Sequence, residues 1–189
     1  MKLWTIFFLI SASVNVFAGD INGVWTGLLT NSDPWGKYPC QLTLKITATS
    51  TDLSTEQLGG DCINPVNPMF LKFQNINSQL IFEDLGNSTG QIDPSLLQFR
   101  SEVRSAIKNL DGGKIGKINS SLTEFKYEYD VRVGWRINIK AEVERLTTPP
   151  NSKPAIRLKL SYFVPDTLHT LPYDFYRTVE GQLVQKGKN

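Results

Sequence analysis

Strict alternation of apolar and polar residues runs through the segment from Phe125 to Val143. Apolar side chains occupy the odd-numbered positions and charged or polar side chains occupy the even-numbered positions, on both sides of Gly134. A period of two places successive side chains on opposite faces of a strand. The segment therefore predicts antiparallel sheet with one buried face and one face in water.

Gly134 divides this segment into two halves. The apolar positions have odd residue numbers in both halves, and this restricts how the halves can be connected. Facing positions of a two-residue hairpin have opposite parity, so the halves form either a hairpin with an odd-length loop or one long strand bent at the glycine. A three-residue loop of Arg132, Val133 and Gly134 would place glycine where a left-handed backbone is needed. A single strand would be about 60 Å long at ~3.3 Å per residue, so we favour the hairpin.

Seven further segments have the composition of strands and are separated by short stretches rich in Gly, Asn, Asp and Pro. They are residues 23–29, 38–46, 54–62, 69–76, 78–85, 155–163 and 174–185. Short strands at such spacing are typical of a barrel or a sandwich.

One segment has helical periodicity instead. Asp93 is a candidate N-cap, Pro94 suits the first helical position, and Gly112 and Gly113 form a stop signal. The apolar positions between them are spaced by three and four residues: Leu96, Phe99, Val103, Ile107 and Leu110. We predict one inserted α-helix near residues 94–110 that covers an open end or a flank of the sheet, because its apolar stripe needs a surface.

The first 18 residues have the pattern of a secretory signal peptide. Lys2 precedes an apolar run from Leu3 to Ile10, and small residues at Val16 and Ala18 mark a cleavage site. The apolar run is shorter than the ~20 residues that span a bilayer, which argues against an uncleaved anchor. We expect residues 19–189 to form a single secreted or periplasmic domain without a transmembrane segment.

The chain has two cysteines, Cys40 and Cys62. In an exported protein they are expected to form a disulfide bond, with two buried thiols or an intermolecular link as the alternatives. If the two positions face each other directly, the hairpin between them is centred on Thr51, inside the polar stretch of residues 47–52. Turn chemistry and disulfide pairing then require the same register.

Charge and motifs argue against several classes of function. Twenty basic and 18 acidic residues give a net charge of +2 with no long run of one sign, so nothing indicates nucleic acid as a partner. The chain has a single histidine, His169, and no serine lies in a sequence that resembles a nucleophile elbow. One histidine and two cysteines that are expected to pair with each other are too few ligands for a zinc site. We expect no catalytic residue, no metal and no cofactor; hydrolysis by paired carboxylates such as Glu56 and Asp61 is the enzymatic alternative.

Two Asn-X-Ser/Thr sequons begin at Asn87 and Asn119. They would be glycosylation acceptors in a eukaryotic secretory pathway, and their positions near predicted turns are consistent with exposure. The sequence does not distinguish a bacterial source from a eukaryotic one.

The first strand begins Gly23-Val24-Trp25 and resembles the Gly-x-Trp signature of lipocalins and the similar start of avidin-like barrels. The resemblance implies a mainly β fold, an antiparallel up-and-down barrel of about eight to ten strands around a small apolar or amphipathic ligand. It also implies that Trp25 closes one end of the barrel, beside the motif glycine Gly23, and that Arg177 or Arg145 covers the indole.

Aromatic side chains supply the candidate ligand-binding residues. Alternation places one group on the inward face, where it either lines a ligand site or fills a core: Tyr127, Tyr129, Trp135 and Tyr162. Trp35 and Tyr38 lie instead in a loop-like stretch, where an aromatic residue can act as a lid or contact a partner.

Two functions follow from these expectations. The first is a secreted or periplasmic, non-catalytic binding protein whose lipocalin-like barrel takes a small apolar or aromatic ligand. The alternative is a secreted protein-interaction, adhesion or effector module with a filled core, which binds another protein through the inserted helix and the Trp35 loop. Whether the barrel interior is empty or packed distinguishes the two.

Overall fold

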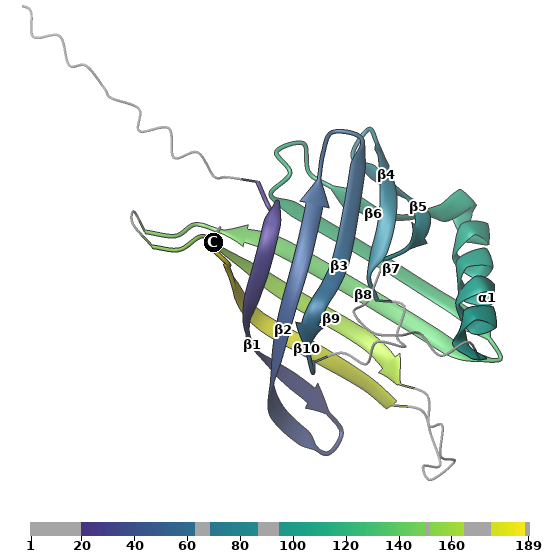
Figure 1. The fold of residues 1–189 in the computed structure, drawn as a ribbon. Coiled ribbons are helices and arrows are strands. Elements are labelled where there is room, and N and C mark those ends of the chain that lie inside the picture. The colour runs from purple at the N-terminus through teal and green to yellow at the C-terminus, as the bar shows by residue number, and fades with distance from the viewer. Residues whose placement is uncertain (1–19, 63–68, 87–94, 150–151, 165–174, 188–189) are drawn as a thin grey trace, which may run out of the picture.

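The fold is a closed barrel of ten antiparallel strands. The computed structural model describes residues 20–62, 69–86, 95–149, 152–164 and 175–187. Its elements are β1 (Gly23–Asp33), β2 (Gly36–Ala48), β3 (Asp52–Gly60), β4 (Leu71–Ile76), β5 (Gln79–Leu85), α1 (Ser95–Asn109), the 3-10 turn η1 (Asp111–Gly113), β6 (Lys114–Ile118), β7 (Glu124–Val133), β8 (Trp135–Leu146), β9 (Ala155–Val164) and β10 (Phe175–Gln185). Each strand pairs with the next along the chain, and β1 pairs with β10 (Figure 1). The predicted up-and-down barrel with one inserted helix is confirmed.

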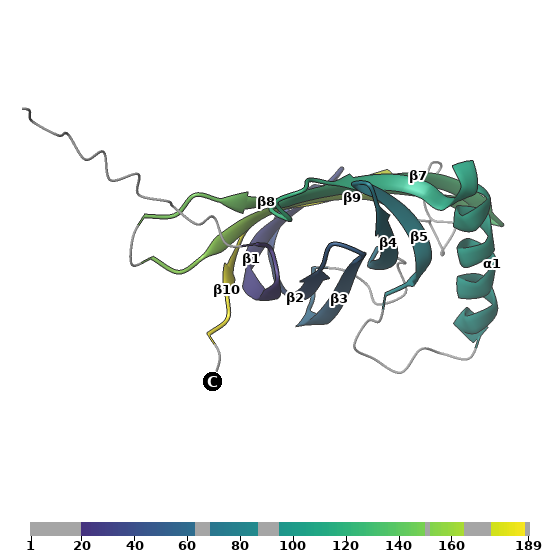
Figure 2. The same ribbon diagram turned by 90° about the horizontal axis from the view of Figure 1, so that it is seen from above.

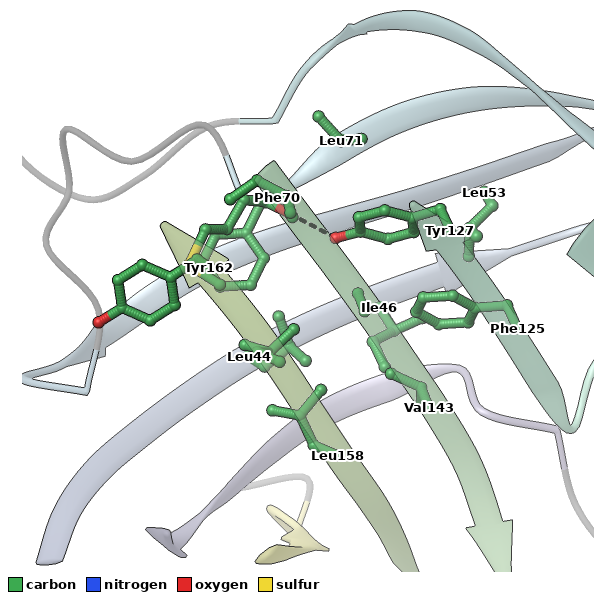
Figure 3. Packing of buried hydrophobic residues seen from close by; sticks show 14 of the residues in the cluster. Leu44, Ile46, Leu53, Phe70, Leu71, Phe125, Tyr127, Val143, Leu158 and Tyr162 are labelled. Carbon is green, nitrogen blue, oxygen red and sulfur yellow. Dashed lines mark hydrogen bonds between the residues drawn. The ribbon is translucent and has the colours of Figure 1, made fainter. Parts of the chain in front are cut away.

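The alternating pattern sorts side chains between the barrel interior and its outer surface. On β7, Phe125, Tyr127, Tyr129 and Val131 are buried while the residues between them are exposed. The inward side chains of all parts of the wall meet in one core, and Figure 3 shows residues of β2, β3, β7, β8 and β9 packed together there. Burial of this continuous apolar face is the main favourable term in the folding of such a sheet.

The connection at Gly134 is a hairpin, and its centre lies one residue later than expected. Val133 pairs with Trp135 and Arg132 with Arg136, so the register is symmetrical about Gly134. Gly134 has a φ of 71°, a left-handed conformation that glycine adopts without a steric penalty. The predicted hairpin with an odd-length loop is therefore present, but Arg132 and Val133 belong to the strand rather than to the loop.

The predicted disulfide bond between Cys40 and Cys62 is present, with the two Cα atoms 4.9 Å apart. Next to it, Leu42 pairs with Gly60, which is the register centred on Thr51. A bulge then shifts the pairing by one residue, because Leu58 has no partner between the pairs Thr43–Gly59 and Leu44–Gln57. Disulfide and turn therefore agree on the hairpin, and the bulge absorbs the remaining difference.

Helix α1 closes a gap in the barrel wall. The neighbouring strand β6 is only five residues long and pairs with β5 over Gln79–Ile81 and with β7 over Phe125–Tyr127. Helix α1 packs against both β5 and β7, and Figure 2 shows it at that side of the barrel. Val103 and Ile107 are completely buried in this contact. The helix thus covers a flank of the sheet, as its apolar stripe predicted.

Strand β6 was missed by the sequence interpretation, which assigned residues 111–117 to a helix stop followed by a turn. The strand has only five residues, Lys-Ile-Gly-Lys-Ile, which is too short for alternation to be recognised. Gly116 is required there, because a Cβ atom at this position would lie 2.7 Å from the carbonyl oxygen of Lys126. The glycine that looked like a turn signal instead allows the close approach of β6 and β7.

Candidate functional site

The hairpin between β1 and β2 presents two exposed aromatic side chains. Trp35 lies in the tight turn and is 59% exposed, while Tyr38 at the start of β2 is 46% exposed. The tip of this hairpin extends past the end of β3 (Figure 1). We call Trp35, Tyr38 and the turn that carries them the aromatic hairpin.

Asp33 fixes the conformation of the aromatic hairpin. Its Oδ1 accepts hydrogen bonds from the backbone N–H groups of Trp35 at 3.0 Å and Gly36 at 3.2 Å. Its Oδ2 accepts a hydrogen bond from Nη2 of Arg177 at 3.1 Å, and the Asp33 side chain is only 4% exposed. Because Arg177 lies on β10, the turn is tied to the barrel wall by a shielded ion pair.

Tyr162 extends this contact into the barrel. It is the cross-strand partner of Arg177, and its hydroxyl group donates to the carbonyl oxygen of Cys62 at 3.5 Å. Burial raises the pKa of the Tyr162 phenol, and the hydrogen bond with Arg177 partly opposes this rise. Asp33, Arg177, Tyr162 and Cys62 therefore form a polar network, which we call the rim network, between the hairpin and the disulfide.

The inward tyrosines are part of the buried core. Tyr127, Tyr129 and Tyr162 are each at most 3% exposed. The Tyr127 hydroxyl donates to the carbonyl oxygen of Met69, and the ring packs against Phe73 and Phe125. Each of the three side chains is therefore packed against its neighbours in the described core.

Burial also changes the acidity of the interior phenols. It raises the pKa of Tyr127 and of Tyr129 well above the ordinary value of tyrosine. The cause is desolvation, which favours the neutral form of each phenol. The Trp135 side chain, the fourth expected inward aromatic, lies outside the described part of the structure.

Trp25 packs at the opposite end of the barrel. Its side chain has no exposed surface, and its Nε1–H donates to the carbonyl oxygen of Ile21 at 2.9 Å. The guanidinium group of Arg145 lies 5.1 Å from the ring centroid, within the range of a cation–π interaction. Of the two arginines proposed to cover Trp25, Arg145 therefore does so, whereas Arg177 serves the rim network. Gly23, with a φ of 140°, begins the strand that carries the indole.

A groove of 680 Å³ lies on the outer surface, where β6 meets β7. Its lining comes from β5, Leu110, η1, β6, β7 and β8. The charged residues among the lining are Asp111, Lys114, Lys117, Lys126, Glu128, Asp130, Lys140 and Glu142. Positive and negative side chains alternate across the strands, as in the facing pairs Lys126–Glu142 and Glu128–Lys140. The alternation predicted a charged outer face for the β7 and β8 residues of this groove. It did not identify the groove, because the other side of the groove depends on the missed strand β6.

The remaining residues singled out in the sequence can be compared with the described part of the structure. The described residues contain no group of three or more His, Cys, Asp or Glu side chains arranged to hold a metal ion. His169 and the sequon residue Asn87 lie outside the described residues. Asn119 is described, and its carboxamide is engaged in the β6–β7 turn, where Oδ1 accepts from the N–H groups of Thr123 and Glu124. In the described segments, no helix is both long and apolar enough to cross a membrane.

Asp33 is the residue at this site that sequence interpretation overlooked. The signal for it was present, since Asp followed by Pro is typical of the first two positions of a turn in which the carboxylate bonds nearby N–H groups. Its ion pair with Arg177 spans 144 positions of the chain, and no local pattern indicates a contact at that range.

Comparison with protein-family models, with curated proteins and with solved structures finds no match for this chain.

Proposed function

We propose that this chain is an exported, non-catalytic interaction protein that binds a partner protein through the aromatic hairpin. One observation carries the proposal: Trp35 and Tyr38 stay exposed on a turn that Asp33 and Arg177 hold in one conformation. Trp and Tyr are enriched among the residues that dominate binding energy at protein interfaces. Holding them in place before binding lowers the entropic cost of association.

The packing of the interior supports this function over a small ligand inside the barrel. A ligand beside Tyr127, Tyr129 or Tyr162 would have to displace neighbouring core side chains. Displacing well-packed side chains costs more than filling an existing cavity. The closure of one barrel end by Trp25 and Arg145 supports the resemblance to lipocalins as an architecture, without supporting their ligands.

The inserted helix contributes less to the proposed surface than the hairpin does. Helix α1 uses Val103 and Ile107 to seal the wall, and Leu97 is its exposed large apolar side chain among those described. A single exposed leucine needs no functional explanation. We therefore restrict the proposed contact surface to the aromatic hairpin.

Export is supported by two independent features. The N-terminal residues have the order of a signal peptide, and the Cys40–Cys62 disulfide bond is the state that cysteines adopt in an oxidising compartment. Both features support a secreted or periplasmic location.

Site-specific photo-crosslinking tests the proposed function. A photoreactive phenylalanine analogue replaces Trp35 in one sample and the exposed Leu28 of β1 in a matched sample, in cells that produce the protein. We expect a specific adduct from position 35 that disappears when unlabelled wild-type protein is added in excess. The double variant Trp35→Ala/Tyr38→Ala should fail to compete, while Leu28→Ala should compete like the wild type.

Two results would contradict this proposal. One is equal competition by the double variant, because the aromatic pair would then contribute nothing to binding. The other is a small lipophilic ligand that shifts the tryptophan fluorescence of the double variant as strongly as that of the wild type. Such a response would come from the barrel interior and would favour the small-ligand function.

A further inference from the structure

A third exposed aromatic side chain, Tyr176, lies at the start of β10 and is 46% exposed. Two neighbouring side chains hold its ring. The ring of Phe163 on β9 packs against it, with the centroids 5.9 Å apart, and the guanidinium group of Arg136 on β8 lies 5.9 Å from its centroid. The Tyr176 ring is therefore exposed to solvent and restricted in its motion before any partner binds, which lowers the entropic cost of a contact.

The strand register places Tyr176 beside the aromatic hairpin. Strands β1 and β10 pair as far as Ser32 and Thr178. Beyond this pair, Arg177 bonds Asp33, the residue that fixes the turn of the hairpin. Tyr176 is adjacent to Arg177 in the chain, and the start of β10 lies at the same end of the barrel as the hairpin tip (Figure 1). The exposed aromatic surface therefore continues from the hairpin to Tyr176.

Arg132 places an unpaired positive charge near Tyr176. It is exposed and stands directly opposite Arg136 in the β7–β8 register. Asp130 is already bound to Arg136, which donates to it from Nε at 3.1 Å and from Nη2 at 2.6 Å. Arg132 has no salt bridge within the part of the chain that the structure describes. Like charges directly opposite each other on neighbouring strands are destabilising, so an additional carboxylate beside Arg132 would be favoured.

Lys37 is a second exposed cation, on the hairpin itself, and it forms no salt bridge with any described residue. The carboxylates of Asp33 and Asp130 are each bound by an arginine. Asp61 lies just beyond the end of β3 and accepts a hydrogen bond from the N–H of Gln41 at 2.7 Å. The charges that stay unpaired directly beside the aromatic rings are therefore positive, which favours an acidic partner over a basic one.

We propose that the partner of the aromatic hairpin is a protein with an acidic contact surface, which covers Trp35 and Tyr176 together and presents a carboxylate to Arg132. This inference rests on the proposed function. Apolar side chains of the partner pack on the two rings, and its carboxylate replaces the contact between two like charges by an ion pair. Aromatic residues supply most of the binding energy in such an interface, whereas the ion pair supplies selectivity and a faster association.

A second set of photo-crosslinking positions tests the extent of the surface. The photoreactive phenylalanine analogue replaces Tyr176 in one sample and Ile76 in a matched sample, and Ile76 is 52% exposed at the end of β4 that lies away from the hairpin. We expect position 176 to give an adduct of the same mass as position 35, and position 76 to give none. As a purified competitor, Tyr176→Ala should be about tenfold weaker than the wild type.

Charge reversal in the same competition assay tests the chemistry of the partner. Arg132→Glu should compete about fivefold more weakly than the wild type, because it meets the partner's carboxylate with a like charge. The matched control Lys117→Glu makes the same change of charge at an exposed position of β6 and should compete like the wild type. Arg132→Gln should be about threefold weaker at low salt, and a high salt concentration should remove that difference by screening.

The outcomes separate this inference from the proposed function. An adduct from position 35 without one of the same mass from position 176 would overturn the extended surface and leave the hairpin as the contact. Equal competition by Arg132→Glu and the wild type would overturn the acidic contact. Loss of competition in both Arg132→Glu and Lys117→Glu would show a general effect of net charge and would also refute it. Absence of an adduct from position 35 would refute the proposed function, and this inference with it.

Discussion

Replacement of Asp33 measures how firmly the aromatic hairpin is held. In Asp33→Ala the N–H groups of Trp35 and Gly36 lose their acceptor, at about 1 kcal/mol for each hydrogen bond. Loss of the ion pair adds about 1–2 kcal/mol, below the ~3–5 kcal/mol of a fully buried pair because Arg177 remains 27% exposed. We expect the free energy of unfolding to fall by about 3–4 kcal/mol in total, which is a decrease in Tm of about 10 °C.

Asp33→Asn separates the two contributions. The carboxamide oxygen can still accept from the turn, so only the charge is lost and the expected cost is about 1–2 kcal/mol. Urea unfolding followed by circular dichroism gives the free energies of unfolding of the wild type, Asp33→Ala and Asp33→Asn. The control is Glu180→Ala on an exposed strand face, whose free energy of unfolding is expected to lie within about 0.5 kcal/mol of the wild-type value. The reasoning fails if Asp33→Ala is as stable as this control. Equal losses in the Asn and Ala variants would show that the turn hydrogen bonds contribute nothing.

Three further perturbations have expected outcomes. Replacing both Cys40 and Cys62 by alanine should lower the free energy of unfolding by about 3 kcal/mol, from the entropy of a loop with a sequence separation of 22; no change in the urea midpoint would contradict this. Burial raises the pKa of the Tyr127 phenol in the folded state. The free energy of unfolding is therefore unaffected below the unfolded pKa of about 10, where the phenol is neutral in both states. As pH rises above that value the phenol ionises only in the unfolded chain, and the free energy of unfolding falls by up to ~1.4 kcal/mol per pH unit. Tyr127→Phe should weaken this dependence in unfolding measured from pH 9 to 11, and an unchanged slope would disprove the assignment. Gly60→Ala should cost about 2 kcal/mol or more, because its Cβ would lie 2.1 Å from a backbone oxygen at a φ of 107°, whereas Gly59→Ala, with open space around it, should cost about 0.5 kcal/mol or less in the same assay.

The sequence predicted the features that depend on local periodicity. Alternation identified the inward faces of β7 and β8, and parity together with the cysteine spacing predicted the two hairpins centred near Thr51 and Gly134. These predictions succeed because a strand with one wet face must alternate, whatever its neighbours are. The helix was also predicted correctly, because its apolar positions are spaced by three and four residues and lie on one helical face.

Features that depend on pairing between distant segments were not predictable. The contact of Asp33 with Arg177 joins residues 144 positions apart. The resemblance to lipocalins left Arg177 and Arg145 as alternatives for covering Trp25, and only the structure shows that Arg145 does so. Strand β6 is too short for alternation to be recognised, and its glycine resembles a turn signal.

Closure of the barrel by β1 and β10 has a consequence for when the fold can form. Trp25 in the first strand pairs with Gln185 in the last, and the N–H of Lys186 donates to the carbonyl oxygen of Val24. The wall therefore stays incomplete until nearly the whole chain is available, and contacts of such long sequence separation form slowly. A chain that crosses a membrane unfolded, from its N-terminus, would keep its first strand without a partner throughout passage and would complete the barrel only after the last strand has emerged.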